Sequence, residues 1–253
     1  MSRGAPALGI ALVAGAIFLA CVDIPTGADD LLSFSIDPLA SPSVVVGDTL
    51  RDSAGVATPL SVTAFNYSGQ EVESIQARFR ALDARVRVDS VAGWVVGDSV
   101  STTSSRVLVA VDGFTGFITI PVVLRPDTIV GVNQSDSLFY SLTDSAANVS
   151  DPFGVRVLHG LTATDSAVRS YRVTFDLAAQ QTPGLARLVT DAGRPSSADT
   201  TDATGVATRR IRVDVSRLTS LTDSVIVSAI VKYRGEHVRG SPLRLVLHLR
   251  PQR

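Results

Sequence analysis

The sequence YRVTFDL occupies residues 171–177, and apolar and polar side chains alternate in it at every step. Successive side chains of a β-strand point to opposite faces, so this stretch predicts a strand with one face on a core and the other in water. The segment at residues 209–215 alternates in the same way from Ile211 onward. These two stretches indicate a protein built from half-buried strands.

Short runs of this kind recur from Leu31 onward and are broken by turn residues at intervals of roughly ten residues, which is typical of all-β sandwiches. No stretch after residue 22 has the pattern of an amphipathic helix, so helix is expected to be scarce. The predicted strands are 32–36, 60–65, 75–82, 85–90, 106–111 and 117–124 in the first half, and 138–142, 154–158, 171–177, 185–189, 209–215, 224–233 and 243–249 in the second.

The composition supports the same fold class. Of 253 residues, 45% are hydrophobic and 19% charged, which is enough apolar material for a core. Lys232 is the only lysine, while Val, Thr, Ser and Asp, which suit strands and turns, are abundant. Lys and Arg number 23 against 24 Asp and Glu. This balance argues against nucleic-acid binding, because such proteins carry a concentrated basic excess.

A weak internal repeat predicts two domains. Asp-Thr-Leu at 48–50 and Asp-Ser-Ala at 52–54 are similar to Asp-Ser-Leu at 136–138 and Asp-Ser-Ala at 144–146. Each half also ends in an apolar run closed by Arg-Pro, at 125–126 and at 250–251. The same beginning and end therefore occur twice. We expect one domain at residues 31–125 and a second at residues 126–253.

The amino-terminal segment has the parts of an export signal. Arg3 supplies positive charge, residues 8–19 form an apolar run, and Ala20 precedes Cys21. The run is too short for a transmembrane helix, which needs roughly 20 apolar residues. Residues 1–20 are therefore predicted to be a signal peptide, and the polar residues 21–30 a tether.

The sequence Phe-Leu-Ala-Cys at residues 18–21 resembles the lipobox of bacterial lipoproteins, although Phe18 stands where that family usually has Leu or Val. The resemblance implies cleavage before Cys21 and attachment of lipid to its thiol, and thus a membrane partner. Val22 follows in place of the aspartate that marks inner-membrane retention, which implies the outer membrane. The alternative is an ordinary cleaved signal with an incidental cysteine. Cys21 is the only cysteine, so disulfides cannot stabilise the rest of the chain.

The second half contains a turn at 201–207, a strand at 209–215 and the segment 223–229, and the first half contains a similar strand and turn at residues 104–116. These features give both halves a resemblance to the bacterial immunoglobulin-like domains of invasins and intimins. It implies two tandem immunoglobulin-like β-sandwiches after the signal segment. It also implies a non-enzymatic spacer, scaffold or adhesion module of the cell envelope.

Catalytic motifs are absent from the sequence. There is no Gly-x-Ser-x-Gly elbow, no His-Glu-x-x-His zinc site and no cysteine pair, and Lys232 precedes Tyr233 rather than the Ser or Thr of a phosphate loop. His159, His237 and His248 have no spacing that converges on a metal, so surface positions are expected. We therefore expect neither an enzyme nor a cofactor.

Two groups of residues are candidate binding sites. Asp191, Asp199 and Asp202 lie in the longest polar stretch and predict either a calcium site or a plain solvated loop. Arg78, Arg80, Arg85 and Arg87 predict either an arginine ladder for phosphate or carboxylate groups, or a charged solvent face that opposes aggregation. The ladder would make the chain a ligand-binding lipoprotein that recognises an envelope glycan or protein, which is the alternative to a spacer.

Overall fold

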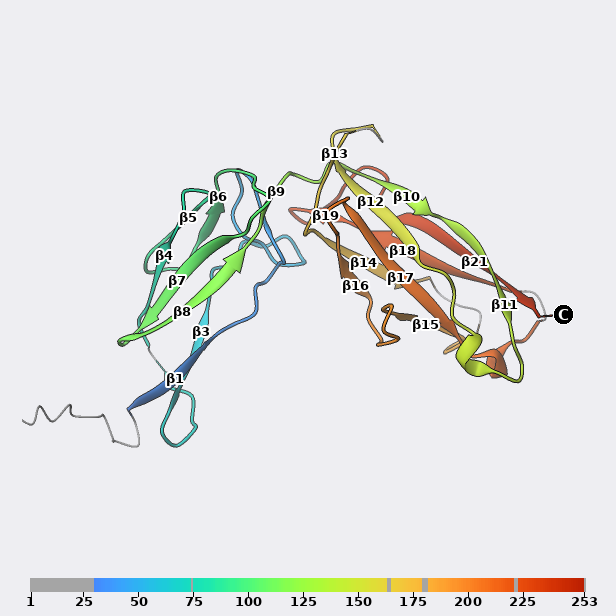
Figure 1. The fold of residues 1–253 in the computed structure, drawn as a ribbon, viewed down its shortest axis with the longest axis horizontal. Coiled ribbons are helices and arrows are strands. Elements are labelled where there is room, and N and C mark those ends of the chain that lie inside the picture. Colours follow the sequence, from blue (N-terminus) through green and yellow to red (C-terminus); the bar gives the residue numbers. More distant parts are fainter. Residues whose placement is uncertain (1–29, 74, 163–164, 179–181, 221–222, 253) are drawn as a thin grey trace, which may run out of the picture.

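The computed structural model describes residues 30–73, 75–162, 165–178, 182–220 and 223–252. This part of the chain is all-β and forms two tandem immunoglobulin-like sandwiches (Figure 1). The predicted fold class is therefore confirmed. Cys21 and the predicted signal peptide lie outside the described residues.

In its described residues, the first sandwich is built from nine strands in small sheets, with the orders β4-β7-β8, β1-β3 and β5-β6 and the parallel pair β2-β9. Its strands are β1 (Leu31–Ile36), β2 (Val44–Val45), β3 (Val62–Asn66), β4 (Ala77–Ala81), β5 (Val86–Val88), β6 (Val95–Gly97), β7 (Ser105–Val111), β8 (Phe114–Ile120) and β9 (Val122–Val123).

The second sandwich packs the sheet β10-β12-β17-β15 against the sheet β11-β21-β18-β14-β16, and the hairpin β19-β20 stands apart from both. Its strands are β10 (Thr128–Asn133), β11 (Ser135–Tyr140), β12 (Phe153–His159), β13 (Ser166–Ala167), β14 (Arg172–Leu177), β15 (Ala186–Val189), β16 (Ala198–Thr200), β17 (Val206–Val213), β18 (Asp223–Ile230), β19 (Lys232–Tyr233), β20 (Glu236–His237) and β21 (Leu243–Pro251).

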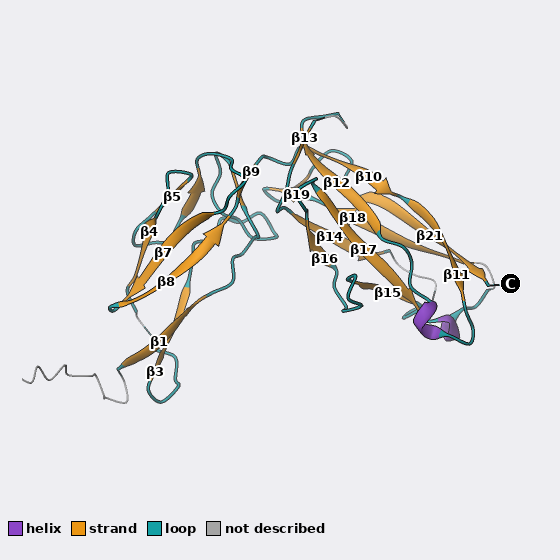
Figure 2. Ribbon diagram, viewed as in Figure 1, coloured by secondary structure: helices purple, strands orange, loops and turns teal. Residues whose placement is uncertain are grey.

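Helix is confined, in the described ranges, to two single turns of 3₁₀ type, η1 (Ser145–Ala147) and η2 (Val215–Arg217) (Figure 2). Val215, predicted to end a strand, instead begins η2, because the Asp214 side chain accepts a hydrogen bond from Ser216 N and caps the turn. Within the same residues, no helix has both the length and the apolar character that crossing a bilayer requires.

The strict alternation of the strands builds the two cores. In β14, Val173 and Phe175 are buried while Arg172 is exposed, as their parity predicts. In β17, Ile211 and Val213 are buried likewise. The predicted strand at 117–124 is broken at Pro121, which separates β8 from β9, because proline has no N–H for a sheet ladder.

Two adjacent valine pairs link the cores. In the parallel pair β2-β9, Val44 lies opposite Val122 and Val45 opposite Val123. Val44 and Val122 belong to the core of the first sandwich, whereas Val45 and Val123 belong to the core of the second. Successive side chains of a strand face opposite ways, so the pair β2-β9 lies between the two cores and contributes side chains to both. We call this pair the wall. The predicted domain boundary lies just beyond it, in the connection from β9 to β10.

Alanine at the two neighbouring positions should therefore weaken different sandwiches. We expect Val44→Ala to reduce amide-exchange protection first in β7, and Val45→Ala to reduce it first in β12 and β18. Each substitution should lower the free energy of opening of its sandwich by roughly 1–3 kcal/mol, because it removes buried apolar surface and leaves a cavity. Val56→Ala is the control, because Val56 is 60% exposed. Loss of protection in the same sandwich for both variants would contradict the shared wall.

Candidate functional site

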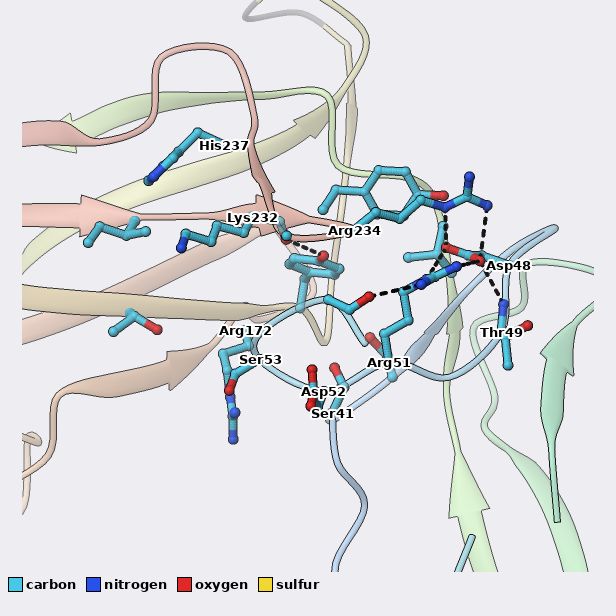
Figure 3. Close-up of a pocket in the computed structure, with 18 residues that line it drawn as sticks. Ser41, Asp48, Thr49, Arg51, Asp52, Ser53, Arg172, Lys232, Arg234 and His237 are labelled. Atoms are coloured by element: carbon cyan, nitrogen blue, oxygen red, sulfur yellow. Dashed lines mark hydrogen bonds and ion pairs between the residues drawn. The ribbon is translucent and has the colours of Figure 1, made fainter. Parts of the chain in front are cut away.

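A buried carboxylate joins the two sandwiches. Asp48, in the turn after β2, is 4% exposed. Arg234, from the turn between β19 and β20, donates from Nε and Nη2 to its two oxygens at 2.9 and 3.0 Å. Arg51 donates from Nε and Nη2 at 3.0 and 3.1 Å. Figure 3 shows both guanidinium groups directed at Asp48, one from each sandwich.

Local bonds hold these side chains in place. Thr49 N donates to Asp48 Oδ1 at 2.9 Å, and Arg51 Nη1 donates to Gly55 O at 2.8 Å, which closes the turn over the carboxylate. On the other side, Arg234 has a φ of 52°, the left-handed conformation of a tight hairpin. Its guanidinium lies 5.4 Å from the centre of the Tyr233 ring. Contacts within each turn thus hold both arginines in the direction of Asp48.

The charges around Asp48 set its ionisation. Burial alone would raise the pKa of its carboxyl, but the hydrogen bonds from Arg234 and Arg51 outweigh burial and hold that pKa well below its ordinary value. Nearby, burial raises the pKa of Tyr171, whose hydroxyl donates to Lys232 O at 2.7 Å. The Asp48 carboxyl is therefore ionised at neutral pH.

Two glycines, one from each sandwich, lie in contact across the interface between the sandwiches, which we call the joint. A side chain at Gly55 would collide with the backbone of Arg234 and Gly235, and one at Gly235 would lie 2.9 Å from Ala54 O. Both glycines have positive φ, 87° and 85°. The two hairpins therefore meet backbone to backbone, an approach that only glycine permits.

A cavity of about 290 Å³ lies beside this contact. The first sandwich contributes Ser43 and Asp52 to it, and the second contributes Arg172 on β14, Ile230 on β18 and Lys232 on β19. His237 also lines it. Lys232, Arg172 and His237 lie on the second sandwich, while Ser41, Asp52 and Ser53 lie on the first (Figure 3).

The predicted arginine ladder is only partly free. Arg78 and Arg80 are exposed on β4 and have no ion pair among the described residues. Arg85 pairs with Asp83 at 3.7 Å, and Arg87 pairs with Asp98 at 2.8 Å. The structure therefore leaves Arg78 and Arg80, two of the four, without an ion pair among the described residues.

The three aspartates of the polar stretch each have a separate role. Asp191 pairs with Arg210 at 2.9 Å and Asp199 with Arg209 at 3.1 Å. Asp202 accepts hydrogen bonds from Thr204 and Val206 within its own turn. Across the described ranges, no three His, Cys, Asp or Glu side chains gather as a metal ion would require. The structure does not bring the predicted calcium ligands together.

The histidines also have separate partners. His159 Nδ1 lies 2.8 Å from Asp127 Oδ2, and His248 Nδ1 lies 3.1 Å from Ser224 Oγ. His237 and His248 are exposed, as predicted, and His159 is half-buried.

Comparison with known proteins gives only distant structural likenesses. No family model and no curated protein matches the chain. Domains 4 and 5 of the S-layer protein SbsC align with 13% identity and a TM-score of 0.31 over 87% of this chain and 99% of that one. The protocadherin GammaB4 extracellular domain aligns with 12% identity and a TM-score of 0.28 over 88% and 33%. Domains 3–5 of Drosophila OTK align with 11% identity and a TM-score of 0.27 over 88% and 63%. The fold assignment rests on the strand order and the cores of this chain.

Substitution of Gly55 should separate the sandwiches without unfolding them. Gly55→Ala and Gly69→Ala share the cost of a positive φ, about 1 kcal/mol, but only Gly55 has backbone against it. We expect small-angle X-ray scattering to give a broader pair-distance distribution for Gly55→Ala than for the parent protein, and an unchanged distribution for Gly69→Ala. A Gly55→Ala profile identical to that of the parent would disprove the close contact.

Removal of the buried charge should alter stability and its pH dependence. Asp48→Asn should lower the free energy of unfolding at pH 7 by about 1–2 kcal/mol, a modest loss because Arg234 is half-exposed and screened by solvent. The folded pKa is depressed, so the stabilisation by Asp48 is present above its ordinary value of 3.8 and is lost as pH falls below it.

Denaturant unfolding between pH 7 and pH 3 measures this effect. The stability difference between the parent and Asp48→Asn should be constant down to about pH 4 and shrink below it. Asp176→Asn, at an exposed site on β14, is the control. A difference that grows on acidification would be inconsistent with a paired carboxylate.

Proposed function

We propose that this chain is an exported bacterial lipoprotein, held to a membrane through Cys21, in which two sandwiches form a stiff, non-enzymatic spacer or scaffold of the cell envelope. The proposal rests on the contacts between the two sandwiches at the joint. Domains within one chain ordinarily move, because the interfaces between them are small and polar. Here the wall formed by β2 and β9 and the buried Asp48 oppose bending.

The arrangement of the ends supports a spacer. β1 begins at the end of the first sandwich that lies away from the joint, and β21 ends at the far end of the second (Figure 1). A group held at one end is thus separated from the other by both sandwiches. The ten residues from Cys21 to Asp30 add a reach of at most about 35 Å when extended.

A second candidate function is capture of an anionic envelope glycan. Arg78 and Arg80 favour it, since both are exposed and lack ion pairs among the described residues. Guanidinium groups bind carboxylates and phosphates through paired hydrogen bonds. The outer membrane is the site we propose for both functions, from Val22 at the position after the cysteine.

Lipid attachment is tested by metabolic labelling in a Gram-negative host with a clickable fatty acid. The parent chain should carry the label and sediment with membranes, whereas Cys21→Ser should lose the label and stay with the exported soluble protein. Ala28→Ser, in the predicted tether, retains the cysteine and should be labelled. Label that survives Cys21→Ser would disprove attachment at this residue.

The same material separates a spacer from a binder. Residues 28–253 are incubated with solubilised envelope fractions at increasing concentration. A spacer gives no saturable binding. Saturable binding that is abolished by Arg78→Glu with Arg80→Glu, but not by Arg244→Glu, would replace the spacer with the glycan-binding function.

A further inference from the structure

The cavity between the sandwiches has a surplus of positive charge. Four basic side chains line it, namely Arg51, Arg172, Lys232 and Arg234, against the two carboxylates of Asp48 and Asp52. In a partly enclosed site, such a surplus attracts anions more strongly than it would in open solvent.

Both carboxylates are already engaged by the protein. Asp48 accepts bonds from the two arginines of the joint. Asp52 Oδ1 accepts from the backbone N–H groups of Ala54 and Val56 within its own turn, at 2.9 Å each. Arg172 and Lys232 have no ion pair among the described residues. Two cations of the lining are therefore free to receive a ligand.

The remaining walls suit a carbon skeleton. Val45, Ile230 and the rings of Tyr171 and Tyr233 line the same cavity. Its volume of about 290 Å³ lies at the lower end of the range for small-molecule sites. The lining therefore combines positive charge and apolar surface in a space for a compact organic molecule.

We propose that this cavity binds a small organic anion, of about the size of a sugar acid or a sugar phosphate, through its carboxylate or phosphate group. Arg172 and Lys232 attract and bind the anionic group, and Tyr171, Tyr233 and Ile230 contact the skeleton. The site goes beyond the proposed function, because a spacer needs no ligand. Since both sandwiches contribute walls, a bound ligand would also tie the joint more tightly.

Isothermal titration of the full chain tests the proposal with three probes that share one ring. Glucuronate carries a carboxylate, glucose 6-phosphate carries a phosphate, and glucose is uncharged. We expect saturable binding of at least one of the charged probes and none of glucose. Which charged probe binds distinguishes a carboxylate from a phosphate ligand.

Variants connect the binding to the cavity. Arg172→Gln should weaken it roughly tenfold through loss of a charge-assisted bond. Lys232→Gln should weaken it by a similar factor, and it removes no ion pair within the described residues, so the fold is preserved. Arg244→Gln, at an exposed arginine of β21 outside the cavity, should bind as the parent does.

Weaker binding in either cavity variant, with Arg244→Gln unchanged, supports the site. The proposal is overturned if neither charged probe binds up to about 10 mM, if glucose binds equally well, or if both cavity variants bind as the parent does. Because these readouts do not involve the membrane or the lipid, they can fail while the spacer function stands, and the reverse also holds.

Discussion

The arrangement of the two sandwiches depends on the alternation of side chains along two very short strands. In β2 and β9, consecutive valines face opposite ways, so one residue of each strand enters the first core and the next enters the second. Tandem domains are usually joined by a linker that is independent of both cores. Here the wall belongs to both, and displacement of one sandwich from the other would expose Val45 and Val123 to water.

The buried carboxylate adds direction to this apolar contact. Hydrophobic packing is not directional, and a wall of valines alone would tolerate several angles between the sandwiches. Asp48 requires donors at defined positions, and leaving it unpaired in a buried place is costly. The bonds from Arg234, together with the contact of Gly55 with Gly235, select one orientation. We interpret the ion pair as a device for specificity rather than for stability.

Much of the fold was predictable from local pattern, but the joint was not. The strands at 171–177 and 243–249 were predicted correctly because their alternation is strong. No strand is predicted at β10, because Gly131 interrupts a short apolar run in which apolar and polar residues do not alternate. Asp48 and Arg234 are 186 residues apart, and nothing near either indicates the other. The repeat places Asp48 near the beginning of the first half, whereas its contact across the joint depends on tertiary structure alone. The cavity depends on the same contact.

The position of β21 has a consequence for biosynthesis. It is the last strand of its sandwich in chain order, yet it lies inside a sheet, with β11 parallel to it on one side and β18 antiparallel on the other. That sheet therefore stays open until residues 243–251 have emerged from the ribosome. Pairing of such distant segments is slow, because loop closure must precede it. A nascent chain that lacks these residues therefore carries a complete first sandwich and a second one whose sheet is still open.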